Sequence, residues 1–475
     1  MRTAIFLIPL LVITLLGTGC QSAPRLPNIV VIMADDMGYG DVGVYNVESR
    51  IPTPHMDRLA QAGMRFTDAH APSSVCTPTR YALLTGRYAW RTPPLERGVT
   101  RGYDPLIIDT TRQTIASMLK SAGYRTAVIG KWHLGLGSEK PTDYFRPLAP
   151  GPRSLGFDYY YGIPASLDMP PYVWVENELV VEAPTDSTQD TMPCCIGAFW
   201  RGGAMAPDFD HAAVLPVITE KAIRYIQEHA AAAHGQPMFL YVPLAAPHTP
   251  WLPSEDYQGA SQAGEYGDFT VQVDAAVGAM ADALDRSGIG ENTLLIVMSD
   301  NGAYWRPQEI AQYDHRANHH WRGMKGDIHE GGHRVPFIAR WPERIAVGSV
   351  TNQLTTHTDL LATFAAVART SPATGTAEDS HNLLPVLRGG EPFERAAVHH
   401  SSEGMVAIRQ GPWKLIEGQG SGGFTPVAVA PEDPQGQLYH LGEDPGEARN
   451  LYLDEPDHTA RLHALLASIR ERGSL

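Results

Sequence analysis

Four short apolar runs, each followed directly by polar residues, constrain the fold of this chain more than any other feature of its sequence. The runs are rich in Val, Ile and Leu, which is typical of strands buried on both faces of a sheet; they cover residues 28–34, 124–130, 238–244 and 293–298. Three segments that read as helices lie between them, at residues 53–62, 111–122 and 268–284. Strands that alternate with helices predict an α/β fold in which helices cover both faces of a parallel sheet.

Polar side chains recur at one place in this pattern, the point where each run ends. In chain order, these residues are Asp35 with Asp36, Lys131 with His133, His248, and Asp300 with Asn301. In open α/β sheets, ligands bind beyond the carboxyl ends of the strands. The four clusters are therefore expected to meet on one rim of the sheet.

The acidic and amide groups among these residues favour a hard metal ion. Asp35, Asp36, Asp300 and Asn301 offer oxygen ligands, which suit Ca²⁺ or, less well, Mg²⁺. Taken singly, either Asp-Asp or Asp-Asn-Gly is more typical of a turn after a strand than of a metal site. The cationic and imidazole groups, joined by Lys325, predict a positive rim that moves protons, whereas each alone would be typical of a solvated loop.

A second feature is the segment Cys76-Thr77-Pro78-Thr79-Arg80. Ser73 and Ser74 are good helix N-cap residues, and Pro is tolerated in a first helical turn. Cys76 is thus expected at a helix N-terminus, where unpaired N–H groups favour an anion, with Arg80 one turn further on the same face and Gly86 ending the helix. A buried structural cysteine before a helix is the alternative for this segment alone.

The charge and the N-terminus limit the partners and the location. A net charge of -15 argues against nucleic acid. The apolar run 4–16 after Arg2 predicts a signal peptide over residues 1–20 rather than a membrane span. Gly19-Cys20 is similar to a bacterial lipobox, although Gly17 stands where Leu is usual. We therefore expect export, either as a lipoprotein of the outer membrane or periplasm anchored through lipidated Cys20, or by secretion.

The remaining segments are less regular. Residues 141–189 are rich in Pro, Gly and Tyr and read as long surface excursions. Residues 371–380 read as a linker, which places short strands within 397–415 and a helix at 457–472 in a separate C-terminal α+β unit, residues 381–475. The adjacent Cys194 and Cys195 could be free, bonded to each other, or bonded elsewhere.

Several ordered motifs resemble those of the type I, formylglycine-dependent sulfatases, an arylsulfatase-like family of the alkaline phosphatase superfamily. The first is the Cys76 segment with Leu83-Leu84-Thr85-Gly86-Arg87. The others follow in the family's order: Met33-Ala34-Asp35-Asp36-Met37-Gly38, Gly130-Lys131-Trp132-His133-Leu134-Gly135, Pro247-His248-Thr249-Pro250 and Glu330-Gly331-Gly332-His333-Arg334-Val335-Pro336. Residues 408–415 and 438–445 resemble the family's C-terminal subdomain, so the likeness covers nearly the whole chain.

The resemblance implies a large, mixed but mostly parallel sheet sandwiched by helices, in a catalytic domain at residues 28–370. It also implies that a formylglycine-generating enzyme oxidises Cys76 to formylglycine, whose hydrate attacks sulfur. Arg80 and Lys131 would hold that hydrate, and Lys131 with Lys325 would stabilise the sulfate oxygens. His248 would protonate the leaving alcohol, and His133 would take the proton that releases sulfate. The Ca²⁺ ligands would be Asp35, Asp36, Asp300, Asn301 and the oxidised Cys76.

The substrate expected from the resemblance is a sulfated polysaccharide or glycosaminoglycan, with a lean toward 6-O-sulfated galactose or N-acetylgalactosamine. Candidate sugar-binding residues are Trp90, Arg101, His319, His320 and His333, the last standing where many relatives carry an aliphatic residue. Two alternatives stay open. One is a phosphonate or phosphate ester hydrolase of the same superfamily, and the other is a surface lipoprotein that binds sulfated glycan without turnover.

Overall fold

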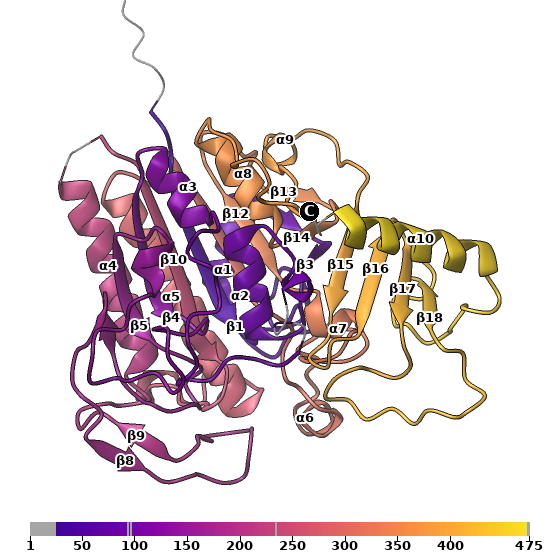
Figure 1. Cartoon of the computed structure of the whole chain (residues 1–475), viewed down its shortest axis with the longest axis horizontal. Helices are drawn as coiled ribbons and strands as arrows, with labels where there is room; N and C mark the ends of the chain where they lie inside the picture. The colour runs from indigo at the N-terminus through magenta and orange to yellow at the C-terminus, as the bar shows by residue number, and fades with distance from the viewer. Residues whose placement is uncertain (1–24, 93–94, 96, 233–234, 473–475) are drawn as a thin grey trace, which may run out of the picture.

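The computed structural model describes residues 25–92, 95, 97–232 and 235–472. The predicted signal peptide and Cys20 lie outside the described residues. The core is a ten-stranded sheet with the strand order β13-β2-β12-β11-β1-β10-β4-β5-β6-β7 (Figure 1). Among the described residues, no helix has the length and apolar character that crossing a membrane requires.

The centre of this sheet is parallel and consists of the four predicted strands. In spatial order they are β11 (Thr293–Ser299), β1 (Asn28–Asp35), β10 (Met238–Pro247) and β4 (Arg125–Lys131). Every residue of β1, β10 and β11 is buried. Continuous apolar runs in these strands follow from burial on both faces, because no position along them meets solvent.

The outer strands make the sheet mixed. On the β11 side lie β12 (Phe337–Arg340) and β2 (Met64–Phe66), both antiparallel to their inner neighbours, and then β13 (Ser349–Thr351). On the β4 side lie parallel β5 (Tyr159–Ile163) and antiparallel β6 (Val175–Glu176) and β7 (Leu179–Val180). The prediction that residues 141–189 are surface excursions is therefore wrong for β5, whose Tyr and Gly residues hid a strand that is almost wholly buried.

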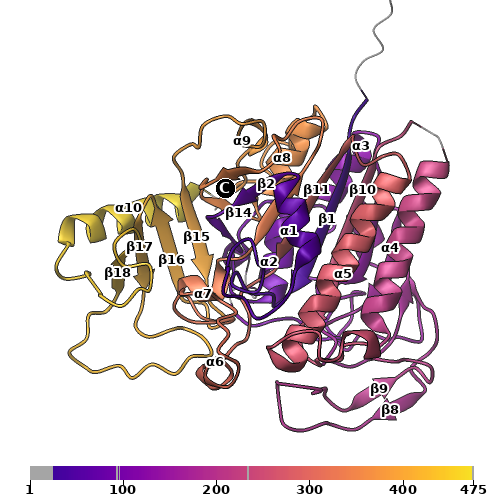
Figure 2. The same cartoon turned by 180° about the vertical axis from the view of Figure 1, so that it is seen from behind.

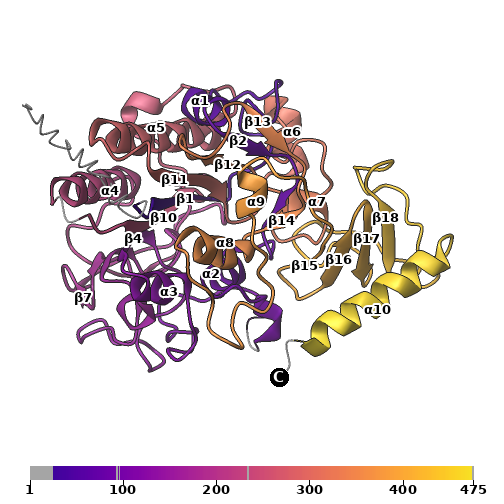
Figure 3. The same cartoon turned by 90° about the horizontal axis from the view of Figure 1, so that it is seen from above.

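Helices cover both faces of the sheet, as Figure 3 shows from above. One face carries α1 (Pro54–Gln61), α4 (Val214–Ala231) and α5 (Gly264–Arg286), and the other carries α2 (Cys76–Thr85), α3 (Ile115–Ser121) and α8 (Asp359–Val367). Helix α3 begins later than the predicted residue 111. Thr114 caps it by accepting a hydrogen bond from the Ser117 backbone N–H at 3.1 Å, while the Ser117 hydroxyl accepts one from the Thr114 N–H at 2.9 Å.

A second, four-stranded antiparallel sheet stands beside the main one (Figure 2). It consists of β15 (Ala396–His400), β16 (Val406–Gln410), β17 (Trp413–Glu417) and β18 (Gln437–His440). Helix α10 (Pro456–Arg472) packs Leu462 and Leu466 against Ile408 and Leu415 of this sheet. The predicted fold class, a mostly parallel sheet between helices with a small C-terminal antiparallel sheet, is confirmed.

Short elements complete the chain. The paired strands are β3 (Ala69–His70) with β14 (Thr355–Thr356), and β8 (Asp186–Thr188) with β9 (Gly203–Met205). The short helices are α6 (Pro307–Tyr313), α7 (Glu330–His333) and α9 (Leu384–Leu387), and three further turns are 3-10 helices at Ala89–Arg91, Pro152–Leu155 and Glu255–Tyr257.

Gly130 shows how tightly the central strands approach one another. Its φ is +142°, and a Cβ added there would lie 2.0 Å from the Pro243 carbonyl oxygen of β10. We expect Gly130→Ala to lower the free energy of unfolding by about 3 kcal/mol, because it combines backbone strain with overpacking. The measurement is the urea concentration at the midpoint of unfolding.

Gly123→Ala is the matched control for this substitution. Gly123 also has a positive φ, +90°, but an added Cβ would meet nothing within 4 Å. This variant should lose only the backbone contribution, about 1 kcal/mol. Equal losses of unfolding free energy at the two glycines would show that the close approach of β4 to β10 adds nothing to the effect of the Gly130 substitution.

Candidate active site

The four predicted polar clusters meet where the parallel strands end. Asp35 closes β1 and Asp36 follows it, while Asp300 and Asn301 follow the neighbouring strand β11. Lys131 ends β4, and His248 follows β10. All six side chains are buried, so the sheet brings carboxylates, an amide, an ammonium and an imidazole into one enclosed site.

Asp35 and Asp36 each meet a lysine. Lys131 Nζ donates to Asp35 Oδ2 in a close ion pair, and Lys325 Nζ donates to Asp36 Oδ2 at 2.7 Å. Asn301 Nδ2 donates to the other Asp36 oxygen at 2.7 Å. The site is thus a compact network in which acidic and basic side chains alternate.

Helix α2 adds Cys76 and Arg80 to this network. Its N-cap is Val75, and no side chain caps it, so the expectation that Ser73 or Ser74 would do so is wrong. Cys76 is the first residue of the helix, and its Sγ lies 3.5 Å from Asp35 Oδ1. Arg80, one turn later, donates to Asp300 Oδ2 at 2.8 Å and to the Lys131 carbonyl at 2.9 Å. Gly86 ends the helix in the left-handed conformation, as predicted.

Burial and charge set the protonation of these groups. Burial raises the pKa of the Cys76 thiol well above its ordinary value, although Lys131 and Lys325 oppose that shift. Burial would also raise the pKa of Asp35, but Lys131 and other nearby charges hold it well below its ordinary value. For Asp300, burial and repulsion from Asp35 raise the pKa to about 7. The site therefore contains an ionised carboxylate crowded against a second one.

Two histidines face the site with one nitrogen each. His133 Nε2 donates to the Thr100 carbonyl at 2.8 Å, which leaves Nδ1 as an acceptor; within the described chain, Nδ1 has no hydrogen-bond partner. His248 Nδ1 donates to the Thr249 carbonyl at 2.6 Å, which leaves Nε2 toward Asp36 at 3.7 Å. Burial lowers the pKa of both rings, and for His248 the Lys325 ammonium adds to that shift while the Asp36 carboxylate opposes it.

The carboxylates fit a hard divalent cation. Asp35 and Asp36 place ligand atoms within 4.8 Å of those of Cys76 and His248. The Asn301 Oδ1 atom is buried and, among the described residues, has no hydrogen-bond partner. A buried amide oxygen without a donor beside several carboxylates is the environment in which Ca²⁺ binds, because it takes oxygen ligands of both kinds.

A pocket of about 730 Å³ opens from this site. Its inner end is lined by Asp36, Cys76, His133, His248 and Lys325, and its outer wall includes Asp168, Cys195, Arg201 and Trp251. The outer wall residues were not predicted from the sequence.

Ser166 was also missed. Its hydroxyl accepts from Lys131 Nζ at 3.0 Å and lies 3.3 Å from His248 Nε2. It follows β5, the strand that sequence reasoning overlooked. The same rule that located the other clusters, polar residues after a buried strand, would have found Ser166 and Asp168.

Of the five predicted sugar-binding residues, only Arg101 lines this pocket. His319 and His320 pack against each other and against Trp321, away from the pocket. Trp90 stacks between Tyr88 and the Arg91 guanidinium beside the small sheet. The structure thus places these three aromatic side chains in packing contacts outside the pocket.

His333 also lies elsewhere, in a closed cluster under the small sheet. Its Nε2 lies 3.1 Å from both Lys414 Nζ and the Ile328 carbonyl, and its Nδ1 lies 3.0 Å from His70 Nδ1. The ring is fully buried. Helix α7 turns the side chain toward β17 and away from Cys76, which explains why the sequence position gave a misleading hint.

Comparisons with known proteins agree with this geometry. A family model described as Sulfatase matches residues 27–370. The N-acetylgalactosamine-6-O-sulfatase of Bacteroides thetaiotaomicron is 34% identical over 520 residues, which cover 99% of this chain and 100% of that protein. Human arylsulfatase A is 34% identical over 459 residues, covering 90% of this chain and 83% of that protein.

Solved structures give the same picture. A sulfatase of Bacteroides thetaiotaomicron, solved in work on the metabolism of multiple glycosaminoglycans, superposes with a TM-score of 0.85 at 33% identity. The match covers 94% of this chain and 100% of that one. The likeness thus extends over both sheets.

Proposed function

Because this chain belongs to the sulfatase family and is therefore a sulfuric-ester hydrolase, we propose that it removes a 6-O-sulfate from N-acetylgalactosamine or galactose in a sulfated glycan. The observation that supports this most is the meeting of Cys76, His133 and His248 at the inner end of one pocket large enough for a sugar ring. The full-length relative that acts on N-acetylgalactosamine 6-O-sulfate supports the choice of sugar.

We propose that Cys76 supplies the nucleophile after oxidation. A formylglycine-generating enzyme would convert it to formylglycine, whose hydrate offers one hydroxyl to attack sulfur and a second to release the product. The unmodified thiol is a poor alternative, because burial keeps it protonated. Arg80 and Lys131, which are linked by the hydrogen bond from the Arg80 guanidinium to the Lys131 carbonyl, would hold the oxygens of residue 76.

The two histidines take opposite proton-transfer roles in this proposal. As the first hydroxyl of residue 76 bonds to sulfur, its proton passes to the carboxylate of Asp300, whose pKa is raised to about 7, and the bond from sulfur to the sugar oxygen breaks. His248, protonated on both ring nitrogens when the anionic ester lies beside it, gives its Nε2 proton to that leaving oxygen. His133 Nδ1 accepts a proton from the second hydroxyl of residue 76, which releases sulfate. The carbonyls of Thr249 and Thr100 keep the reacting nitrogens turned inward, because each accepts the N–H of the opposite ring nitrogen.

Positive charge offsets the charge of the sulfate ester. Arg80, Lys131 and Lys325 balance Asp35, Asp36 and Asp300, and a bound divalent cation would leave a net positive site in a chain of net charge -15. We propose Ca²⁺ as that cation, held by Asp35, Asp36, Asp300, Asn301 and residue 76. When bound, it would polarise the sulfate group and lower the barrier to attack.

Removal of this cation is expected to abolish most activity. Dialysis against EGTA should lower kcat/KM by at least about 100-fold, since one preorganised charge contributes that much to transition-state stabilisation. Readdition of Ca²⁺ should restore the rate and raise the thermal unfolding midpoint, because ligands that bind only the folded state stabilise it. Readdition of Mg²⁺ is the comparison, and full activity in protein shown by elemental analysis to be free of metal would contradict the assignment.

We also propose that the protein is exported, anchored through Cys20 or secreted, and that residues 28–370 and 381–475 are its catalytic and C-terminal domains. An exported protein can reach glycans outside the cell, which agrees with the proposed substrate. Membrane fractionation of cells that produce the wild type or Cys20→Ala tests the anchor. If the variant stays in the membrane fraction as fully as the wild type, lipidation of Cys20 is not what holds it there.

The identity of the sugar is tested with purified protein. Mass spectrometry must first show that the Cys76 peptide has lost about 18 Da, the change that oxidation of the thiol to an aldehyde requires. Sulfate release should be fastest from N-acetylgalactosamine 6-sulfate or galactose 6-sulfate, and at least about 100-fold slower from the 4-sulfate isomers, because a misplaced ester loses the approach to both histidines. An aryl phosphate serves to test phosphate ester hydrolysis. Faster release from a 4-sulfate would overturn the proposed position, and faster cleavage of the phosphate would favour the superfamily alternative.

A further inference from the structure

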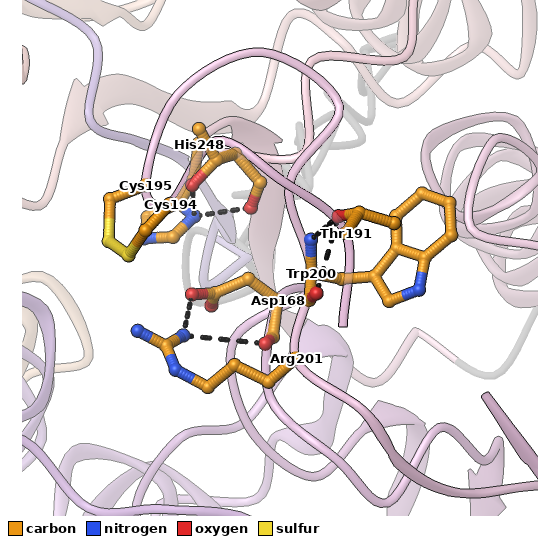
Figure 4. Close-up of a disulfide and its surroundings, with 8 residues drawn as sticks. Asp168, Thr191, Cys194, Cys195, Trp200, Arg201 and His248 are labelled. Carbon is orange, nitrogen blue, oxygen red and sulfur yellow. Dashed lines mark hydrogen bonds and ion pairs between the residues drawn. A yellow bond between two sulfur atoms is a disulfide. The ribbon is translucent and has the colours of Figure 1, made fainter. Parts of the chain in front are cut away.

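The outer wall of the pocket holds a disulfide between adjacent residues, Cys194 and Cys195. Figure 4 shows it beside the ring of His248, with the ion pair of Asp168 and Arg201 next to it. The sequence left the state of these cysteines open, and nothing in the reaction at Cys76 uses them. The reaction at Cys76 therefore does not explain why this disulfide lies in the pocket wall.

Loop closure does not explain this disulfide. A cross-link stabilises a fold mainly by restricting the unfolded chain, and that effect grows with the length of the closed loop. Cys194 and Cys195 have a sequence separation of one, so the bond encloses no loop. The main effect of the disulfide must therefore be local, on the structure at the tip of the segment that joins β8 to β9.

The base of that segment is firmly held. The Thr191 N–H donates to the Trp200 carbonyl at 2.9 Å, and the Trp200 N–H donates to the Thr191 hydroxyl at 2.7 Å. The Trp251 N–H donates to the Gly197 carbonyl at 2.8 Å, which fastens the tip to the strand-end segment that carries His248. The disulfide is therefore presented at a fixed place relative to His248.

The wall next to the disulfide has unused polar groups. Asp168 is 4% exposed, and its Oδ1 atom has no hydrogen-bond partner among the described residues, while Oδ2 meets Arg201 Nη1. In the described part of the chain, Arg201 Nη1 donates to the Asp168 carbonyl at 3.4 Å and to Asp168 Oδ2, and the Arg201 side chain is 39% exposed. A guanidinium has five N–H donors, so its outer edge faces the pocket with donors to spare.

We infer that Cys194–Cys195, Asp168 and Arg201 form the subsite for the leaving sugar. The inference rests on the proposed function: His248 protonates the leaving oxygen, so whatever flanks His248 on the outer wall faces the ring that leaves. A sugar ring presents apolar C–H edges between hydroxyl groups. The disulfide offers a compact, polarisable apolar edge, and the Asp168–Arg201 pair offers an acceptor and donors for hydroxyls.

The test compares two substrates with each variant, N-acetylgalactosamine 6-sulfate and a 4-nitrophenyl sulfate. The double variant Cys194→Ala/Cys195→Ala should lower kcat/KM for the sugar sulfate relative to the aryl sulfate by at least about tenfold, mainly through KM, because the aryl ester makes fewer of the lost contacts. Arg201→Ala should shift the same ratio in the same direction, and Arg201→Lys should recover part of it.

Two controls guard against a general loss of folding. Met192→Ala alters the same tip at a side chain that is 78% exposed and should leave the ratio unchanged. Treating the wild type with a phosphine reductant, which opens the disulfide without substitution, should reproduce the shift in the ratio, and reoxidation should reverse it. The double variant should not respond to the reductant.

The outcomes separate the two proposals. A wild type that turns over the sugar sulfate, with the double variant and the reduced wild type keeping the wild-type ratio, overturns the subsite and leaves the proposed function intact. A wild type that hydrolyses only the aryl sulfate overturns both.

Discussion

Replacing Cys76 with alanine is expected to abolish sulfate-ester hydrolysis, with a fall in kcat/KM of at least about 10⁴-fold, as for other covalent nucleophiles whose removal disables a whole catalytic unit. The reason is geometric as well as chemical. Cys76 is the one side chain at the first turn of α2 that reaches Asp35 from the pocket, and neither histidine can act without an oxygen at residue 76.

The fold should survive this change, because the side chain loses a single sulfur atom. Thermal unfolding of Cys76→Ala and the wild type should therefore give midpoints within a few degrees. A useful internal control is wild-type protein with graded oxidation of Cys76, whose rate should scale with the aldehyde fraction measured by mass spectrometry. Retention of even about 1% of the activity in Cys76→Ala would exclude residue 76 as the nucleophile.

The second large effect is expected for stability. Lys414 of β17 is fully buried, and its Nζ lies 3.1 Å from Glu330 Oε1 and 2.8 Å from Glu447 Oε1. Burial would raise the pKa of Glu330, but Lys414 and neighbouring cations hold it well below its ordinary value. Lys414→Met removes the shared cation, so we expect the free energy of unfolding to fall by about 3–5 kcal/mol, the usual cost of breaking a buried ion pair on one side.

Lys140→Met is the matched control. Lys140 forms an ion pair of similar length with Asp104, 2.6 Å, but its side chain is 73% exposed. Its loss should cost less than about 1 kcal/mol. The double variant Lys414→Met/Glu447→Gln should recover part of the loss, since it leaves one fewer unpaired carboxylate. If urea unfolding of Lys414→Met matches that of Lys140→Met, the cluster does not hold the small sheet against α7.

Sequence patterns predicted the centre of the fold and missed its margins for a physical reason. The four central strands are buried on both faces, so their apolar composition identifies them without any partner. Strand β5, in contrast, contains Tyr159, Tyr160, Tyr161 and Gly162, and its burial depends on α4 and the loops that cover it. Strand β12 reverses direction beside β11, and an unbroken apolar run does not encode direction.

The site divides in the same way. Groups that follow strands, such as Asp35 and His248, were located because sheet geometry fixes where strands end. Arg201 and Cys195 come from a long hairpin whose return toward His248 depends on hydrogen bonds of loop backbone, which no periodicity records. His333 belongs to one of the same motifs, but it does not line the pocket, because α7 places its side chain in the buried cluster around Lys414.

The burial of α2 has a consequence for how the protein is made. Every residue from Cys76 to Thr85 is buried, so an enzyme that must grasp the chain around Cys76 cannot do so once the domain has closed. The oxidation proposed for Cys76 must then occur while the segment is still extended, shortly after it leaves the ribosome or the export channel. Oxidation of Cys76 then competes kinetically with folding. The specific activity of a preparation will therefore depend on the fraction of chains that were oxidised before they folded.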